Sequence, residues 1–263
     1  MSLLSKGSPP LLMLIDEFAV MIGEIAEQDR EEAKILLRWF RAARNAPDTQ
    51  TRFVIGGSVN LIYTLDSTGL IDTVNDFYIE RLKPFDCETA GRFIETIFAS
   101  RNIKLGTEVK DAILELVGEP IPYLIAVLLS AVIDRRRTMN VDVTREMVKV
   151  AFEDDLLGGA ASVVLQQYRS RIDQYYHGQE HKAAKTILGI MSKSESPVKQ
   201  ETLYQIYLKS CNLPPGQQVH DDFSRLMHKL DNDFYVVSSD RTYMFFSRVL
   251  KLWWKAHYGF QEY

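Results

Sequence analysis

The chain has 263 residues, of which 46% are hydrophobic and 25% charged, so it can form two or three compact domains and lacks a disordered composition. Its net charge of −4 at pH 7 gives no general attraction to nucleic acid or to an anionic membrane. Cys87 and Cys211 have no His or Cys at ligand spacing nearby, which argues against a disulfide framework or a zinc site and favours a reducing cytoplasm. The apolar run at 11–15 is too short to cross a bilayer, and the sequence does not begin with a signal peptide pattern. We therefore expect a cytoplasmic protein without a membrane segment.

The first 84 residues predict a layered α/β unit. Leu11–Ile15 is a continuous apolar run, typical of a strand buried on both faces of a parallel sheet. A long helical pattern covers Ala19–Asn45, and a second short strand covers Arg52–Ile55. Phe77–Leu82 is a third candidate strand. Strand, helix and strand in this order indicate a parallel α/β arrangement.

Residues 85–178 show an almost purely helical pattern. Asp86 or Thr89 can cap the first helix, Thr144 can cap a later one, and Pro122 suits the first position of a third. Gly158-Gly159 interrupts the pattern before a last helix. We therefore predict an all-α domain here. Its first helix ends at 102, the next two cover 107–117 and 122–137, another begins at 144, and the last ends at 176.

Residues 179–263 predict a winged helix. A linker at 177–180 precedes three short helices, expected at 182–192, 199–210 and 219–231. Strands at 234–237 and 242–246 flank Ser238-Ser239-Asp240-Arg241, whose composition suits a hairpin turn. A final helix at 248–258 carries Trp253 and Trp254, which are expected in the core.

The sharpest motif is the apolar strand 11–15 followed by Asp16 and Glu17. Such a strand delivers two carboxylates at its C-terminal end, where ligands bind in open parallel sheets. Asp16 offers the oxygen ligands that Mg²⁺ prefers, and Glu17 can polarise an attacking water as a general base. A strand that merely ends in an acidic turn would have the same residues. The motif resembles the Walker B element of P-loop ATPases.

Three further segments resemble AAA+ and STAND-type ATPases, in the order expected for that family. The segment Arg52 to Asn60 resembles their strand followed by Gly-Ser, which implies a nucleotide-sensing role for Ser58, with Asn60 as the alternative. Ile79–Asp86 is similar to the junction between their core and their helical lid. Gly118–Leu124 resembles the lid segment whose proline packs near the nucleotide base, which implies that role for Pro122, although a proline also simply suits a helix start. The resemblance covers roughly residues 10–176.

The resemblance implies an α/β fold of three parts. These are a partial P-loop NTPase core of the AAA+ type with a parallel sheet at 1–84, an all-α lid at 85–178 and a winged-helix domain at 179–263. It also implies ATP and Mg²⁺ as ligands of the full-length protein, and a regulatory switch driven by ATP binding and hydrolysis.

One element of that family is missing from these residues. The phosphate-binding loop, Gly-x-x-x-x-Gly-Lys-Ser/Thr, should precede the acidic motif, but Ser5-Lys6-Gly7-Ser8 has suggestive residue types in the wrong order. We expect either a piece of a longer protein or a protein that has lost this part, and in both cases a chain that is inactive alone. The alternative is a non-enzymatic winged-helix DNA-binding or adaptor protein with a degenerate NTPase scaffold.

The predicted winged helix favours a protein partner over DNA. Its third helix would enter a DNA groove, but Asp221 and Asp222 lie at its N-terminal end and repel phosphates. The basic residues that follow are too scattered to form a dense stripe. Arg135-Arg136-Arg137 form either a solvated helix end or a phosphate contact. The sequence is compatible with a homo-oligomer.

Overall fold

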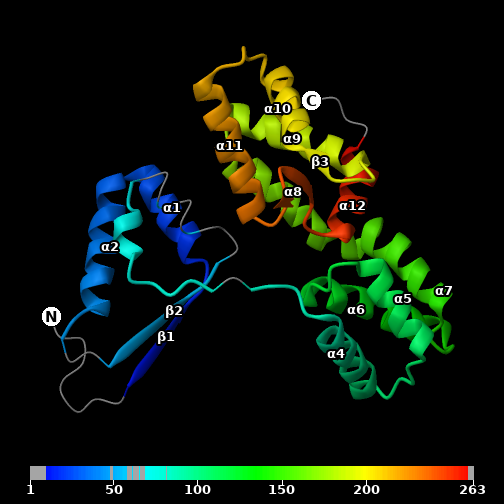
Figure 1. Ribbon diagram of the computed structural model, residues 1–263. Helices are drawn as coiled ribbons and strands as arrows, with labels where there is room; N and C mark the ends of the chain where they lie inside the picture. Colours follow the sequence, from blue (N-terminus) through cyan, green and yellow to red (C-terminus); the bar gives the residue numbers. More distant parts are fainter. Residues whose placement is uncertain are drawn as a thin grey trace. The chain divides into compact units, whose positions relative to one another are not determined.

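The computed structural model describes residues 10–47, 50–57, 61, 65, 69–80 and 82–259. The chain divides into two compact units, Met1–Arg81 and Leu82–Tyr263 (Figure 1). Within the described ranges, no helix is long and apolar enough to cross a membrane.

The first unit is built on two parallel strands, as the sequence predicts. Strand β1 (Leu11–Ile15) pairs with β2 (Thr51–Ile55) in a register that places Ile15 opposite Ile55. Helix α1 (Phe18–Gln28) packs against α2 (Arg30–Arg44), and α2 contacts both β2 and the short 3₁₀ helix η1 (Ile71–Val74). The fully or almost fully buried residues of this unit are Phe18, Ala19, Ile22, Ala33, Leu37, Phe40, Leu65, Leu70, Thr73 and Val74.

The single long helix expected at 19–45 is wrong, because the chain breaks at Asp29. The backbone of Asp29 is extended (φ −150°), and its carboxylate accepts hydrogen bonds from the N–H groups of Glu31 and Glu32 at 2.9 and 3.2 Å. An N-cap of this kind satisfies the free amides at the start of α2. The pattern therefore contains two helices that meet at a cap.

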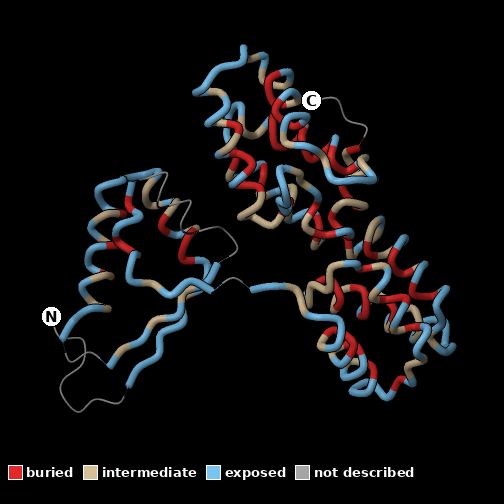
Figure 2. The backbone as a smooth tube through the Cα atoms, in the orientation of Figure 1, coloured by how far each residue is buried: buried red, intermediate tan, exposed pale blue. Residues whose placement is uncertain are grey.

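The expectation that the first strand is buried on both faces is also wrong. The backbone of β1 is drawn mostly in the colour of exposed residues in Figure 2. Leu14 is 72% exposed, Leu12 59% and Val54 on the neighbouring strand 55%. These side chains share one face of the strand pair, because alternate residues of a strand point to the same side. Among the described residues β2 is the only strand that pairs with β1, so this face has no covering layer there.

The third candidate strand, Phe77–Leu82, is not a strand in its described residues 77–80 and 82. The amide of Phe77 bonds to the carbonyl of Val74 at 3.0 Å, which continues the turn after η1 instead of starting a ladder. Tyr78 and Leu82 are 89% and 87% exposed. An apolar run without a neighbouring strand has no partner for its backbone groups and stays irregular.

The first half of the second unit is helical, as expected. Asp86 caps the first helix by accepting the amide of Thr89 at 2.7 Å, and Thr144 caps a later one by accepting that of Met147 at 3.2 Å. The elements are α4 (Cys87–Ser100), α5 (Thr107–Val117), α6 (Pro122–Met139), α7 (Arg145–Val150), the π-helix η2 (Ala151–Leu157), the 3₁₀ helix η3 (Ala160–Ser162) and α8 (Val163–Tyr175).

The second half combines helices with a small antiparallel sheet of strand order β3-β5-β4. Its hairpin turns at Asp240 and Arg241, whose positive φ angles of 47° and 61° suit a tight turn between twisted strands. The linker expected at 177–180 is wrong, because the helix α9 already begins at Gly178. The elements are α9 (Gly178–Lys193), β3 (Val198–Lys199), α10 (Gln200–Cys211), α11 (Gln217–Asn232), β4 (Val236–Ser239), β5 (Thr242–Phe245) and α12 (Arg248–Tyr258).

A single hydrophobic core runs through the second unit from α4 to α12. Trp253 and Trp254 are 1% and 0% exposed within it, which confirms their expected core position. Helix α12 also contacts α5: the amide of Arg248 donates to a carboxylate oxygen of Glu119 at 2.7 Å, and its guanidinium donates to the carbonyl of Glu115. The expected division of this unit near residue 178 stays a prediction.

Candidate active site

The two carboxylates of the acidic motif lie at the C-terminal edge of the parallel strand pair. Asp16 and Glu17 directly follow β1, and Gly56 and Gly57 directly follow β2. The amide of Gly56 donates to the carbonyl of Ile15 at 2.9 Å, so the pairing extends to the last residue of β1. The carboxyl ends of both strands therefore meet at one edge of the pair.

A tight turn at Glu17 connects this edge to α1. Glu17 has a left-handed backbone (φ 51°, ψ 31°), and its amide donates to Oδ1 of Asp16 at 2.9 Å. The next amide, of Phe18, crosses to the carbonyl of Gly56 at 3.2 Å. A left-handed non-glycine residue costs on the order of 1 kcal/mol, and here hydrogen bonds on both sides of the residue hold it.

The glycines lie against the carboxylates. A Cβ atom added to Gly57 would lie 3.5 Å from Oε2 of Glu17, and one added to Gly56 would lie 3.8 Å from Oδ1 of Asp16. These are ordinary van der Waals distances, so the two acidic side chains stand directly beside the end of β2. Both acidic residues are exposed, and their oxygens can reach solvent.

The donor set at this edge suits a magnesium ion held with few protein ligands. Within the described part of the chain, no group of three or more His, Cys, Asp or Glu residues could hold a metal. Mg²⁺ usually keeps several waters and takes only one or two carboxylates together with substrate phosphates. An exposed aspartate at a strand end matches that requirement, whereas a closed zinc or calcium cage would need more ligands.

The remaining predicted site residues lie outside the described residues or in the second unit. Ser58 and Asn60 lie outside the described residues, so the sensor assignment stays a prediction. Pro122 occupies the first position of α6 in the second unit, which is the position that its helix-start chemistry favours. Its proposed contact with a nucleotide base stays a prediction. Arg135, which the sequence left between a helix end and a phosphate contact, pairs with Asp155 on η2, its Nη2 at 3.0 Å from Oδ1.

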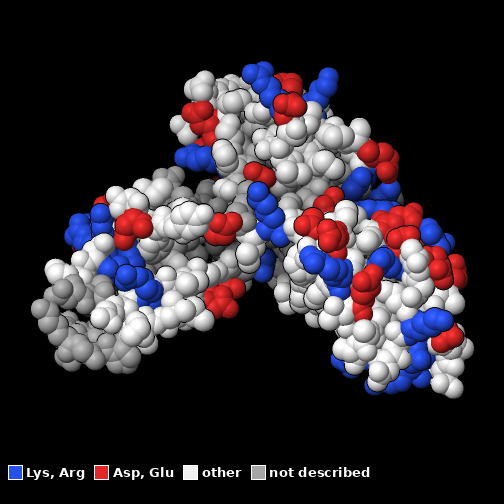
Figure 3. All heavy atoms as spheres, turned by 60° about the horizontal axis from the view of Figure 1, so that its bottom comes forward, with Lys and Arg blue, Asp and Glu red and all other residues white. Residues whose placement is uncertain are grey.

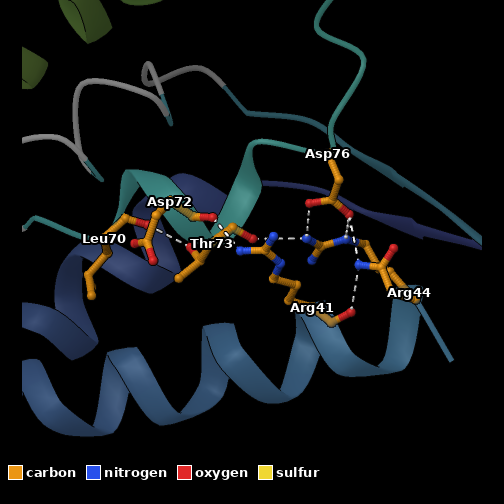
Figure 4. Close-up of polar contacts among 7 residues, drawn as sticks. Arg41, Arg44, Leu70, Asp72, Thr73 and Asp76 are labelled. Atoms are coloured by element: carbon orange, nitrogen blue, oxygen red, sulfur yellow. Dashed lines mark hydrogen bonds and ion pairs between the residues drawn. The ribbon is translucent and has the colours of Figure 1, made fainter.

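Sequence reasoning missed an arginine cluster that fixes η1 on α2 (Figure 4). Arg44 donates from Nη2 to Oδ1 of Asp76 at 2.8 Å and to the carbonyl of Thr73 at 2.9 Å, and from Nε to Oδ2 of Asp76 at 3.2 Å. Arg41 donates to the carbonyl of Asp72 at 2.6 Å. Hydrogen bonds from Arg44, with a smaller contribution from Asn45, hold the pKa of Asp76 below its ordinary value against partial burial. The spacing of Arg41, Arg44 and Asn45 at a predicted helix end was the only sequence signal.

Comparison with known proteins identifies the fold. No family model matches the chain, and no curated protein matches it. A solved structure, a Walker-type ATPase of Pyrococcus abyssi, matches with a TM-score of 0.59 and 19% sequence identity. The match covers 92% of this chain and 62% of that protein, so this chain spans less than two thirds of the longer one. The chain therefore has a fold like that of this Walker-type ATPase, with a mostly helical α/β architecture and a small parallel sheet.

Proposed function

We propose that this chain carries the acidic half of a nucleotide site and belongs to a STAND/AAA+-like switch that binds and hydrolyses ATP. One observation carries the proposal: Asp16 and Glu17 stand at the carboxyl edge of two parallel strands, beside Gly56 and Gly57. This edge is where parallel α/β sheets bind their ligands. The likeness in fold to a Walker-type ATPase supports the same reading.

The proposal gives each acidic residue a separate role. Asp16 would hold Mg²⁺ through water, and the ion would offset the negative charge of the nucleotide phosphates. Glu17, one residue further and turned by its left-handed backbone, would orient and polarise the attacking water. Ser58 or Asn60 would contact the terminal phosphate, and Pro122 would pack near the base.

Phosphate affinity should be low in these 263 residues taken alone. They contain no Gly-x-x-x-x-Gly-Lys-Ser/Thr segment, whose backbone amides and lysine supply most of the phosphate binding in such ATPases. Two adjacent carboxylates repel a triphosphate unless a metal ion bridges them. The acidic residues at this edge therefore supply only part of what tight phosphate binding needs.

The C-terminal half would be the output of the switch. Helices α9, α10 and α11 with the sheet β3-β5-β4 follow the order of a winged helix, and we propose that they form one. Its contact would be with protein rather than DNA. On the face drawn in Figure 3, basic and acidic side chains are interspersed instead of forming a basic stripe.

Titration of the chain with ATP in the presence of Mn²⁺, which replaces Mg²⁺ and is visible by electron paramagnetic resonance, tests the proposal. We expect no saturable calorimetric heat at micromolar nucleotide, and weak metal–nucleotide binding at millimolar concentration that Asp16→Asn abolishes. Glu24→Gln, an exposed acid on α1, is the matched control and should leave binding unchanged. Micromolar binding, or binding indifferent to Asp16→Asn, would mean that the site lies elsewhere.

A second candidate, a non-enzymatic adaptor on a degenerate NTPase scaffold, is favoured by the missing phosphate-binding loop alone. The same titration separates the two candidates. An adaptor should show no binding that depends on Asp16 at any concentration. In a longer natural form that carries the loop, the switch predicts that Glu17→Gln keeps ATP binding and loses turnover.

A further inference from the structure

Helix α2 exposes an apolar pair on the side away from its buried residues. Ile35 is 61% exposed and Trp39 is 56% exposed, whereas Ala33, Leu37 and Phe40 of the same helix are buried. Residues four apart are neighbours on a helix surface, so Ile35 and Trp39 form one patch. Large apolar side chains that meet at the surface mark interaction sites more often than single ones do.

Arg38 lies beside this patch, while Glu31 and Glu32 lie one turn before Ile35 and Glu31 pairs with Lys34 at 3.3 Å. Helix α2 has the sequence REEAKILLRWFRAAR, with basic residues in every turn and acidic residues only at its start. Arg38, Arg41, Ala42, Asn45 and Asp76 line a shallow cavity of about 450 Å³ along the helix. The apolar patch and this groove share the same stretch of α2, and we call them together the α2 outer face.

We propose that the α2 outer face docks an acidic amphipathic helix of a partner protein. An apolar stripe of such a helix would cover Ile35 and Trp39, and its flanking carboxylates would pair with Arg38 and Arg41. Trp and Arg are the residue types that dominate binding energy at protein interfaces. This inference stands on α2 alone and is independent of the nucleotide site.

The same face fits nucleic acid poorly. The carboxylate of Asp76 lines the groove, and the C-terminal end of α2 carries the partial negative charge of a helix terminus. A partner helix can place single carboxylates at Arg38 and away from Asp76, but a phosphate backbone repeats its charge at every step.

Tryptophan fluorescence reports this face directly. The chain has three tryptophans, and Trp253 and Trp254 are 1% and 0% exposed, so Trp39 is the one that a soluble quencher can reach. We expect acrylamide to quench an emission component that Trp39→Phe removes. Emission that resists acrylamide in the free chain would show that Trp39 is already covered, and the proposal would fail.

The binding test uses a display library of amphipathic helical peptides whose polar faces vary from acidic to basic. We expect enrichment of acidic peptides with an apolar stripe, and protection of Trp39 from acrylamide by a synthetic peptide of the enriched sequence. Trp39→Ala and Arg38→Glu should each weaken that peptide at least tenfold with unchanged melting, because both residues lie at the surface. Met21→Ala and Arg52→Glu, exposed apolar and basic positions on α1 and β2, are the matched controls and should bind normally.

Four outcomes of the peptide binding test would overturn the proposal. They are no enrichment, enrichment of basic peptides, enriched peptides that bind Trp39→Ala and Arg38→Glu as tightly as the unaltered chain, and a single-stranded oligonucleotide that protects Trp39 better than the acidic peptide. Sedimentation of the free chain tests whether a second copy of the chain occupies the α2 outer face. A dimer that Trp39→Ala dissociates would assign the face to a second copy of the chain instead.

Discussion

Arg44 and Asp76 form an ion pair in which the arginine side chain is only 9% exposed and the carboxylate 28%. The guanidinium also lies 4.6 Å from the ring centre of Phe40 and 4.2 Å from that of Phe77. The pair therefore joins α2 to the segment that follows η1, with aromatic rings shielding the charge. Removal of one member of such a shielded pair leaves the other without its partner.

Arg44→Met should destabilise the first unit by about 2–3 kcal/mol, because it removes hydrogen bonds to Asp76 and to the carbonyl of Thr73. Arg44→Lys should cost less, since it keeps the charge but not the planar fork. Urea unfolding followed by circular dichroism measures the loss, and hydrogen exchange should accelerate at 71–77. Arg52→Met on exposed β2 is the control, expected within about 0.5 kcal/mol of the unaltered chain. If Arg44→Met has the same free energy of unfolding as the unaltered chain, the ion pair does not stabilise the contact between α2 and the segment after η1.

The Arg44–Asp76 pair should also make the first unit sensitive to acid. The pKa of Asp76 is lower in the folded chain than its ordinary value, mainly because of Arg44. A carboxyl with a lowered folded pKa stabilises fully above its unfolded pKa of about 4, and this stabilisation disappears as the pH falls through the folded pKa. Asp76→Asn should therefore lower stability at pH 7 and have a smaller effect near pH 2. Urea unfolding midpoints of Asp76→Asn and of the unaltered chain, measured at both pH values, test this expectation. An equal loss of stability at pH 7 and at pH 2 would contradict a stabilising role for the negative charge of Asp76.

The exposure of β1 gives a second test of the first unit. Leu14 is 72% exposed and Leu37 is 0% exposed. Leu14→Asp should change the stability of this chain by less than about 1 kcal/mol, whereas Leu37→Asp buries an unpaired charge and should cost several kcal/mol. The two variants carry the same chemical change and are compared by urea unfolding. A severe loss in Leu14→Asp would show that another segment covers β1 in solution.

Local signals predicted β1 and β2, three of the helix starts, and the two acidic residues that follow β1. An apolar run of five residues followed by Asp16-Glu17 contains within itself both the strand and the point where it ends. The parallel pairing with β2 followed from the helical pattern between the two strands, and it is confirmed. Asp86, Thr144 and Pro122 act at helix starts, where the chemistry depends only on the next three residues.

Features that depend on distant neighbours could not be predicted. The apolar sequence of β1 shows that its side chains suit a buried position, but it does not show which strands or helices are present to cover them. Asp29 resembles a solvent-facing helical residue until its side chain is seen to cap α2. The left-handed backbone of Glu17 has no sequence signal, because glycine or asparagine usually marks that conformation. Arg44 and Asp76 are 32 residues apart, and no local pattern joins them.

The proposed winged helix should bind DNA only weakly and without sequence preference. On the exposed side of α11, Gln217 donates to Asp221, and Arg225 pairs with Asp222, so its one arginine is already engaged within the helix. Few cations remain to replace counterions on the phosphate backbone. Fluorescence anisotropy with a labelled duplex should show weak binding that salt abolishes. Tight binding to one duplex over random competitor at physiological salt would contradict the preference for a protein partner.

Gly118 should be the most sensitive glycine at the contact between α5 and α12. Its φ of +73° lies in a region that L residues rarely adopt, and an added Cβ would lie 3.0 Å from Cβ of Arg248. Arg248 has little freedom to move away, because its amide and guanidinium bond to Glu119 and to the carbonyl of Glu115. Gly118→Ala should therefore cost about 1–3 kcal/mol from combined backbone strain and crowding.

In a Trp39→Phe background, the emission of buried Trp253 and Trp254 follows unfolding of the second unit alone. Gly216→Ala is the control, since Gly216 has extended backbone (φ −176°) and open space around it, and its effect should stay within about 0.5 kcal/mol. If both variants unfold at the same urea concentration, Gly118 does not constrain the contact between these helices.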